Sequence, residues 1–526
     1  MSDRESSPRD ILWALGLAIR IAWGALVILT PLLGFWVSSS LATYLNGPIW
    51  LSALAGALLF PIIPAAWEWR ARRRRLEQNP EKHTLLTSSD RLILRTLFVN
   101  LLFLGALLGT YPQLGFTAIS TRGDWMLSGQ QTQRADQARS ALFACAGGLE
   151  WLWALSHDNP YAKYAEGEEP LPTPAPTPAE HIEVRPTPIP VPGPSPRPAP
   201  DVAPGSGSTQ DGSAAADATD SPDSGPTDEP LAREPGQPPL WPMVPTLHPA
   251  VANMPASAKR SVESVARYIA SKESDPFLRV KALHDFAADH IAYDAVALAE
   301  GRYPPQDAET VFRTKLGVCA GYATLLVAMG EVTGDEIVFI TGVSRNFGGD
   351  ISGGGHAWNA AKIEGAWYLI DATWDAGYVH GSTFTKSYST NYLFTPPSIL
   401  GVDHLPDDPP WQLRERPLTR GEFMRQPIMR PGFYASGLSL ITPTRSQISV
   451  EETAILEIEN PHSVKLLAEL TAQGASKGEA CRIDGDKRAT ITCTIERAGS
   501  YQVALFATPS GNSYPRVGQI SVNASP

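Results

Sequence analysis

The sequence lacks the motifs that mark several common functional classes. It contains no metal-binding cluster, no glycine-rich phosphate loop and no dinucleotide-binding fingerprint, so we expect neither a metal nor a cofactor. Basic residues are too few to balance the acidic ones, and the net charge of −11 argues against a nucleic-acid partner. At 526 residues the chain exceeds one ordinary hydrophobic core, so it should fold as several domains.

Three apolar stretches fall within residues 1–120, at 21–37, 49–67 and 96–116. Each approaches the ~20 residues that cross a bilayer as a helix, and each has hardly any polar face. The first stretch lacks a basic start and a small-residue cleavage site, so it does not resemble a cleavable signal peptide. We therefore expect three transmembrane helices in residues 1–120. Buried helices of a soluble domain are the alternative.

Basic residues beside these stretches predict their orientation. Arginines flank the three stretches: Arg20, Arg70, Arg72–Arg75 and Arg95. Because cytoplasmic loops are rich in arginine and lysine, the N-terminus should be cytoplasmic. Three spans then place everything after about residue 120 outside the cytoplasm, as part of an integral membrane protein.

Residues 121–160 should form a juxtamembrane segment. Ala141–Leu155 is apolar but short for a span, and Trp151 and Trp153 suit a membrane interface. We favour an interfacial helix there over a fourth span, which would place the C-terminal half of the chain inside.

Residues 161–250 are rich in proline and should form a disordered linker. Polyproline II rises ~3.1 Å per residue, so residues 171–200 alone would extend roughly 90 Å. The simplest interpretation is a spacer that lets the next domain work away from the membrane. A recognition site for a proline-binding module is the alternative.

A thiol, an imidazole and a carboxylate follow one another as Cys319, His356 and Asp371. These groups are the parts of a nucleophile, its base and the group that orients the base. Cys319 follows Gly317 and precedes apolar residues at helical spacing, so it should begin a helix. A helix N-terminus stabilises a thiolate and supplies N–H donors for an oxyanion. A buried structural cysteine is the alternative for Cys319 taken alone.

The spacing between His356 and Asp371 predicts that a β-hairpin brings them together. Glu364-Gly365 can form a two-residue turn that sets Ile363 opposite Ala366. Counting outward from the turn, His356 and Asp371 become diagonal neighbours on one face, within reach of a hydrogen bond.

Rival residues for these roles lie nearby. Asp375 has the same parity as Asp371 but lies past the expected strand end. His380 and His404 are rival bases, although neither begins a hairpin that also presents a carboxylate.

Three residues around His356 are candidates for lining a substrate cleft. Gly355 ends a run of three glycines that would let another backbone or a substrate approach closely. Trp358 and Trp374 flank the histidine and the aspartate, and packing in the core is their alternative role.

These motifs together resemble the transglutaminase-like superfamily of papain-like cysteine enzymes. The chain reads Gly-Val-Cys-Ala-Gly-Tyr-Ala at 317–323, His-Ala-Trp-Asn at 356–359 and Asp-Ala-Thr-Trp-Asp-Ala-Gly at 371–377. Later segments, Asn-Tyr-Leu-Phe-Thr-Pro-Pro at 391–397 and Asp-His-Leu-Pro-Asp-Asp at 403–408, resemble the kyphoscoliosis peptidase branch. The resemblance covers about residues 255–435.

The resemblance implies an α+β, papain-like catalytic domain over residues 251–430. It also implies that Cys319 is the nucleophile, His356 the base and Asp371 the orienting group. No clear position matches a second oxyanion donor. The membrane anchor departs from the animal members of this branch, some relatives of which have lost the triad and act as scaffolds.

From residue 431 to 526, short alternating segments separated by turns predict an all-β, immunoglobulin-like sandwich. Cys481 and Cys493 could meet across a hairpin and form a disulfide if this domain lies in an oxidising space outside the cytoplasm. Two unpaired buried cysteines are the alternative. Cys145 and Cys319 would stay free.

The leading functional interpretation is a membrane-anchored cysteine peptidase or amidase that acts through a thioester outside the cytoplasm. Its substrates would be amides of proteins or of cell-wall peptides. Water would complete hydrolysis, whereas an amine would complete cross-linking. A non-catalytic envelope scaffold and a cross-linking transglutaminase are the alternatives.

Overall fold

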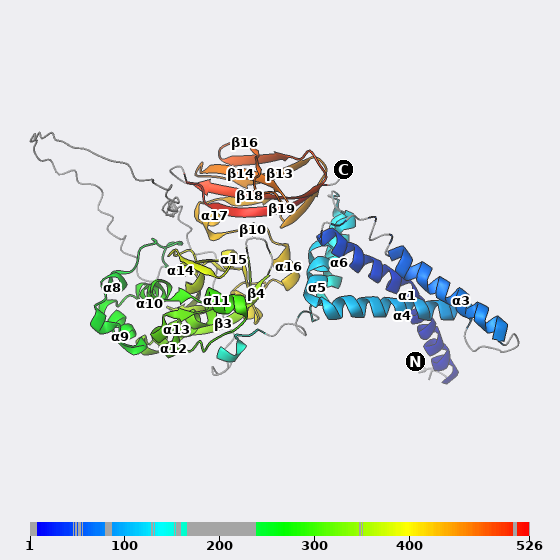
Figure 1. Ribbon diagram of the computed structural model, residues 1–526, viewed down its shortest axis with the longest axis horizontal. Helices are drawn as coiled ribbons and strands as arrows, with labels where there is room; N and C mark the ends of the chain where they lie inside the picture. Colours follow the sequence, from blue (N-terminus) through cyan, green and yellow to red (C-terminus); the bar gives the residue numbers. More distant parts are fainter. Residues whose placement is uncertain are drawn as a thin grey trace, which may run out of the picture.

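The computed structural model shows N-terminal helices, a mixed α/β domain and a C-terminal β-sandwich (Figure 1). The structure describes residues 8–45, 56–78, 87–127, 132–151, 159–165, 238–346, 351–508 and 513–524, with single residues 47, 50, 54, 130, 153 and 349. Most of the predicted proline-rich linker, residues 166–237, lies outside the described residues.

Helices make up the N-terminal body. They are α1 (Pro8–Tyr44), a π-helical turn (Leu58–Ile62), α3 (Ile63–Gln78), α4 (Ser88–Thr110), α5 (Pro112–Arg122) and α6 (Gln133–Gly147). Among the described residues, α4 is long and apolar enough to cross a membrane, and little of it is buried in the protein. The structure therefore supports one spanning helix, by length and composition, where the sequence predicted three.

Helices α5 and α6 pack against the C-terminal half of the chain, beside α16 (Arg420–Arg425) (Figure 1). Arg122 donates a hydrogen bond to Ser449 Oγ at 2.7 Å, and Arg425 donates to the carbonyl of Ser120 at 2.7 Å. The Arg425 guanidinium also lies 4.0 Å from the ring centre of Phe143, in α6. The first part of the predicted apolar helix at 141–155 thus belongs to α6, which contacts the C-terminal half of the chain.

An ion pair also joins the N-terminal region to the C-terminal half of the chain. Arg445 pairs with Asp124 at 2.8 Å, and Asp124 is held within its own region by Arg139 of α6 at 3.2 Å. The N–H of Arg420 donates to Glu150 Oε1 at 3.2 Å. The C-terminal half of the chain is therefore docked on residues 112–150.

A five-stranded antiparallel sheet is the frame of the α/β domain. Its strand order is β8 (Leu393–Thr395), β5 (Ala366–Ile370), β4 (Ile351–Ile363), β3 (Glu336–Arg345) and β9 (His404–Pro406). The longer helices packed with it are α9 (Val262–Lys272), α10 (Pro276–His290) and α13 (Cys319–Thr333). The antiparallel sheet with helices confirms the predicted α+β class for this domain.

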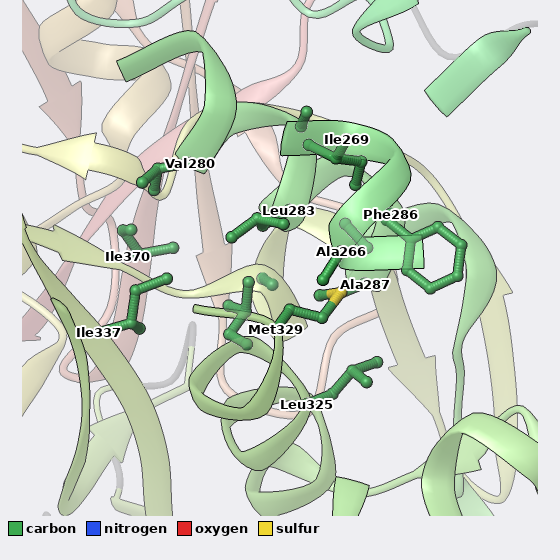
Figure 2. Close-up of a cluster of buried hydrophobic side chains, with 14 of the residues drawn as sticks. Ala266, Ile269, Val280, Leu283, Phe286, Ala287, Leu325, Met329, Ile337 and Ile370 are labelled. Carbon is green, nitrogen blue, oxygen red and sulfur yellow. The ribbon is translucent and has the colours of Figure 1, made fainter. Parts of the chain in front are cut away.

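Apolar faces of these helices and strands form the domain core. Leu283 and Phe286 of α10, Leu325 and Met329 of α13, and Ile337 of β3 belong to one buried cluster (Figure 2). Burial of such side chains stabilises the fold by about 1.5–3 kcal/mol each. The core therefore fixes α13, the helix that carries Cys319, against the sheet.

Shorter elements complete the α/β domain. They are α8 (Pro249–Ala252), β1 (Ala292–Tyr293), α11 (Ala295–Glu300), α12 (Ala308–Thr314), β2 (Leu316–Gly317), α14 (Ala372–Ala376), β6 (Gly377–His380), β7 (Thr383–Lys386) and α15 (Pro397–Leu400). The next two elements, β10 (Ile428–Met429) and α17 (Pro431–Ala435), pack with the C-terminal region. Ordered packing begins before the predicted boundary at 251, because Trp241 is buried and donates to the carbonyl of Asn391.

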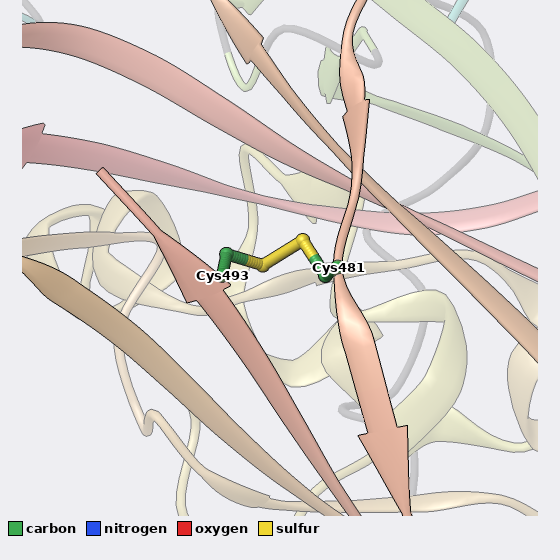
Figure 3. The surroundings of a disulfide bond; sticks show 2 residues. All are labelled: Cys481 and Cys493. Atoms are coloured by element: carbon green, nitrogen blue, oxygen red, sulfur yellow. A yellow bond between two sulfur atoms is a disulfide. The ribbon is translucent and has the colours of Figure 1, made fainter. Parts of the chain in front are cut away.

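The C-terminal region forms a two-sheet sandwich, as predicted. One sheet has the order β10-β19-β18-β14-β15, with β12 also paired to β19, and the other has the order β11-β13-β17-β16. Their bounds are β11 (Ser439–Thr442), β12 (Gln447–Val450), β13 (Thr453–Glu459), β14 (Lys465–Ala472), β15 (Glu479–Ala480), β16 (Arg482–Asp484), β17 (Arg488–Thr494), β18 (Gly499–Thr508) and β19 (Arg516–Ala524). Cys481, between β15 and β16, and Cys493 of β17 form a disulfide, which was one of the two alternatives for this pair (Figure 3).

Candidate active site

Cys319 is the first residue of α13, as predicted, and it is 1 % exposed. Gln306 fixes the start of this helix by accepting a hydrogen bond from the N–H of Val318 at 2.8 Å. Gly321 lets the helix approach that amide, because a Cβ there would lie 2.5 Å from Gln306 Oε1. The nucleophile candidate therefore sits at a rigid helix N-terminus.

The predicted hairpin is present. Ile363 pairs with Ala366 across a turn in which Glu364 and Gly365 have φ values of 52° and 86°, as a two-residue hairpin turn requires. The hairpin brings His356 Nε2 to 2.7 Å from Asp371 Oδ2. Both side chains are buried.

Asp371 is held from two directions. It directly follows β5, and its Oδ1 accepts hydrogen bonds from the N–H groups of Thr373 and Trp374, which caps α14. Its Oδ2 is thereby turned toward His356. β5 therefore ends at Ile370, and Asp371 serves as the cap of the following helix.

Charge favours protonated His356 beside ionised Asp371. Burial alone would lower the pKa of His356, but the charge and hydrogen bond of Asp371, followed by a contribution from Cys319, raise it to about 10. Burial alone would raise the pKa of Asp371, yet His356 and then His404 hold it well below its usual range. The site is thus arranged to hold a proton on the imidazole.

The contact between His356 and Asp371 also assigns the roles of the ring nitrogens. A carboxylate only accepts hydrogen bonds, so Nε2 of His356 must donate to it. The other nitrogen, Nδ1, is then the one that can exchange a proton with a thiol. Cys319 and His356 line the same cleft, and Cys319 is near enough to contribute to the His356 pKa.

The rival residues occupy different places. Asp375 does not contact His356; it binds His284 Nε2 at 3.1 Å and the hydroxyl of Ser389. His380 is exposed at the end of β6. His404, in contrast, lies in the site, with Nε2 3.0 Å from Asp371 Oδ2.

Sequence reasoning missed the role of His404. The segment 403–408 contributed to the family resemblance, but nothing local shows that β9 lies at the edge of the sheet beside β3. The pairing of Ser344 with His404 makes that connection.

A cleft of about 680 Å³ opens onto Cys319 and His356. Gly355 and Trp374, two of the predicted lining residues, line it, together with Arg430 and Arg516 from the C-terminal region. Trp358 instead lies in a buried cluster, with its ring stacked 5.8 Å from that of His356. Trp358 therefore packs against His356 within the core and does not line the cleft.

Residues 159–165 pack against Cys319 but do not line the cleft. Tyr161 is 1 % exposed and shares a hydrophobic cluster with Cys319, Ala320 and Phe339. Burial, followed by the neighbouring Cys319, raises the pKa of the Tyr161 hydroxyl above its usual range.

Asn159 anchors this segment to the sheet. Its amide donates to the carbonyl of Gly342 and to Asp407 Oδ2, each at 3.0 Å. Its Oδ1 would meet a Cβ on Gly355 at 2.7 Å. The close approach that the glycine run predicted is therefore made by the chain's own residues 159–160.

Three potential metal ligands also meet here. Ligand atoms of His356, Asp371 and His404 lie within 4.8 Å of one another. His356 and His404 each form a hydrogen bond with Asp371 Oδ2, at 2.7 and 3.0 Å, which accounts for their closeness to it. The geometry is that of a shared carboxylate acceptor.

Comparison with known proteins supports the fold of both domains. The transglutaminase-like superfamily model matches residues 263–372, and the KY-like, immunoglobulin-like domain model matches residues 420–525. The chain is 31 % identical over 247 residues to kyphoscoliosis peptidase from Mus musculus, covering 45 % of this chain and 37 % of that protein. It is 28 % identical over 269 residues to the protein of the same name from Homo sapiens, covering 50 % and 40 % respectively.

The chain thus spans about two fifths of the length of these relatives. A solved structure of red sea bream transglutaminase aligns with a TM-score of 0.19 and 12 % identity, over 53 % of this chain and 57 % of that one. Residues 263–372 therefore carry a transglutaminase-like domain and residues 420–525 a KY-like, immunoglobulin-like domain, and the chain is similar to kyphoscoliosis peptidase.

Proposed function

We propose that the chain is a membrane-anchored cysteine enzyme that acts on peptide amides by acyl transfer. The observation that supports the proposal is that Cys319 and His356 line one cleft, while His356 is hydrogen-bonded to the buried Asp371. The cleft is large enough for a peptide segment, and its wall combines Trp374 with polar groups. Protein chains and cell-wall peptides are the substrate classes that fit.

The reaction follows from the assigned nitrogens. The Cys319 thiol gives its proton to His356 Nδ1, and the thiolate attacks the amide carbonyl carbon. The C–N bond then breaks, the Nδ1 proton passes to the departing amine, and a thioester remains on Sγ. Nδ1 next takes a proton from water, whose oxygen attacks the thioester carbon. The C–S bond breaks, the carboxylic acid leaves, and Nδ1 returns the proton to Sγ. An amine in place of water would give cross-linking.

Asp371 acts through His356 in this scheme. Its Oδ2 holds Nε2–H, which keeps Nδ1 free for the thiol and stabilises the imidazolium. Backbone N–H groups at the start of α13 are the natural donors to the oxyanion of the tetrahedral intermediate.

The proposed location is outside the cytoplasm, with a cytoplasmic N-terminus and three spans. Support comes from the apolar helix α4, from the arginines beside the apolar stretches, and from the disulfide, which is typical of oxidising compartments. Cys145 is exposed and lies after the last proposed span. It should react with a membrane-impermeant maleimide in intact cells. Labelling only after the cells are opened would place Cys145 in the cytoplasm and contradict the proposed topology.

The first test of catalysis is alkylation of Cys319 against pH. The full chain, purified in detergent, is treated with iodoacetamide, and each cysteine is read by mass spectrometry. The exposed Cys145 serves as the internal reference thiol. We expect Cys319 to label at least about tenfold faster than Cys145 at pH 6, and this advantage to vanish in His356→Ala.

Two further results separate the alternatives. If the alkylation rate of Cys319 depends on pH as that of Cys145 does and is unchanged in His356→Ala, the chain is better described as a scaffold. Incorporation of a labelled primary amine into acceptor proteins, abolished by Cys319→Ala, would identify cross-linking instead of hydrolysis.

A further inference from the structure

The carboxylate of Asp371 has a second histidine partner, which leads to further buried charges. His404 Nε2 shares Asp371 Oδ2 with His356. His404 Nδ1 lies 2.6 Å from Asp403 Oδ1. Arg430 donates to Asp403 Oδ2 at 2.7 Å. A continuous path of hydrogen bonds thus runs from Arg430 to His356, through residues that are all buried.

The hydrogen bonds of His404 define its charge. Both ring nitrogens face carboxylate oxygens, which accept hydrogen bonds and donate none. The two contacts are satisfied together only when each nitrogen carries a proton, so the ring is a cation. With Arg430 and the protonated His356, the cluster then holds three cations against the two carboxylates of Asp371 and Asp403. The excess positive charge favours an anion at Cys319, on the other side of His356.

Groups around His404 support the same assignment. Burial alone would raise the pKa of Asp403, but His404, Arg430 and the Tyr392 hydroxyl lower it below the usual range. Tyr392 donates to Asp403 Oδ2 at 2.8 Å. The rings of Trp358 and His356 lie 5.2 Å from that of His404, so the remaining space around it is filled by ring systems.

Arg430 belongs to the C-terminal domain. It lies within the part that matches the KY-like domain model, and its N–H donates to the carbonyl of Val517, beside the pairing of β10 with β19. Its side chain also donates to the carbonyl of Arg345, in β3, at 3.2 Å. The guanidinium lies 5.3 Å from the ring centre of Trp374, and that ring lies 4.6 Å from His404.

We propose that His404 is a positioning residue for the thiol chemistry, and that the C-terminal domain completes the active site by holding His404 through Asp403 and Arg430. The inference rests on the proposed function of Cys319. His404 keeps Asp371 Oδ2 directed at His356, and its charge offsets the charge of that carboxylate. The two domains therefore form one catalytic unit.

Loss of the His404 cation has a defined consequence. A positive charge near a thiol favours the thiolate, so removing it raises the pH at which Cys319 ionises. A misdirected Asp371 would stabilise the His356 imidazolium less well, which acts in the same direction. If His404 had a purely structural role, its loss would instead lower the alkylation rate of Cys319 by the same factor at every pH, or lower the melting temperature.

The test is the pH profile of Cys319 alkylation in the full chain. The variants are His404→Gln, Arg430→Gln and Arg430→Lys, and Arg488→Gln is the control, since Arg488 is an exposed arginine in β17 of the same domain. We expect His404→Gln to label roughly tenfold more slowly at pH 6 and at the wild-type rate at pH 9, a shift of about one pH unit. Arg430→Gln should shift the profile in the same direction, and Arg430→Lys should restore most of it.

The outcomes separate this inference from the proposed function. If the wild-type profile of Cys319 matches that of Cys145, the proposed function fails and this inference fails with it. If the wild type is activated but His404→Gln and Arg430→Gln follow its profile, or fall by one factor at all pH values, only the positioning role is overturned. Should His404→Gln fail to fold, the comparison of Arg430→Gln with Arg430→Lys decides the same question.

Discussion

Replacing Tyr161 by alanine should expose Cys319 to reagents from the side covered by residues 159–165. The Tyr161 side chain is buried, with its ring 5.6 Å from that of Tyr303, and it shares a cluster with Cys319. The segment is otherwise held by Asn159 and by a hydrogen bond from Gln306 N–H to the Tyr164 hydroxyl. Tyr161 is therefore the main apolar anchor of this segment.

The magnitude follows from burial. An aromatic side chain buries 150–250 Å², and its truncation in a core costs about 3–5 kcal/mol. The Tyr161 hydroxyl has no nitrogen or oxygen partner within the described part of the chain, which reduces its net contribution by roughly 1–2 kcal/mol. A loss of about 3 kcal/mol remains. It would raise the population with an undocked segment roughly 100-fold, because each 1.36 kcal/mol is a factor of ten.

The assay is the rate of Cys319 labelling by a bulky maleimide in the folded chain. Tyr161→Ala should label much faster than the wild type, whereas Tyr161→Phe, which keeps the ring, should stay slow. Ala162→Ser, at an exposed position of the same turn, is the surface control. Equal labelling rates for Tyr161→Ala and the wild type, at equal melting temperatures, would refute the idea that this segment limits access to the thiol.

Three further predictions concern stability. Because the pKa of His356 is raised to about 10, its contribution should be complete below an unfolded-state pKa of ~6.5 and should be lost as pH rises through about 10. The free energy of urea unfolding should therefore be a few kcal/mol lower at pH 10.5 than at pH 7. In His356→Gln this difference should be smaller, and an equal difference in both proteins would contradict the prediction. Replacing both Cys481 and Cys493 by serine should cost about 3 kcal/mol, since the disulfide closes a loop with a sequence separation of 12, and calorimetry of the oxidised and serine forms measures it. Arg345→Met should cost at least about 3 kcal/mol, because the buried guanidinium donates to several backbone carbonyls of residues 402–426, and a loss below 1 kcal/mol would show that water replaces it.

The sequence predicted the part of the site that local rules determine. A two-residue turn and the period of a strand were enough to bring His356 and Asp371 together, because pairing register propagates directly from the turn. The helix that begins at Cys319 was equally predictable from Gly317 and the apolar face that follows. These features depend on neighbours within about twenty residues.

Contacts between distant segments could not be predicted in this way. His404 reaches Asp371 because β9 pairs with β3, and nothing in residues 404–406 specifies that partner. Tyr161 meets Cys319 across 158 residues of sequence, from a segment that its proline-rich surroundings assigned to a linker. Trp358 could have lined the cleft or packed in the core on the sequence alone, and its side chain packs in the core.

The docking of residues 159–165 gives the proline-rich stretch a different mechanical meaning. Residues 159–165 and residues 241–252 both pack on the same α/β domain, so residues 166–237 connect two fixed points on one body. A single proteolytic cut within 166–237 should therefore leave two fragments that stay associated, so that nicking would neither free the α/β domain nor separate residues 159–165 from Cys319.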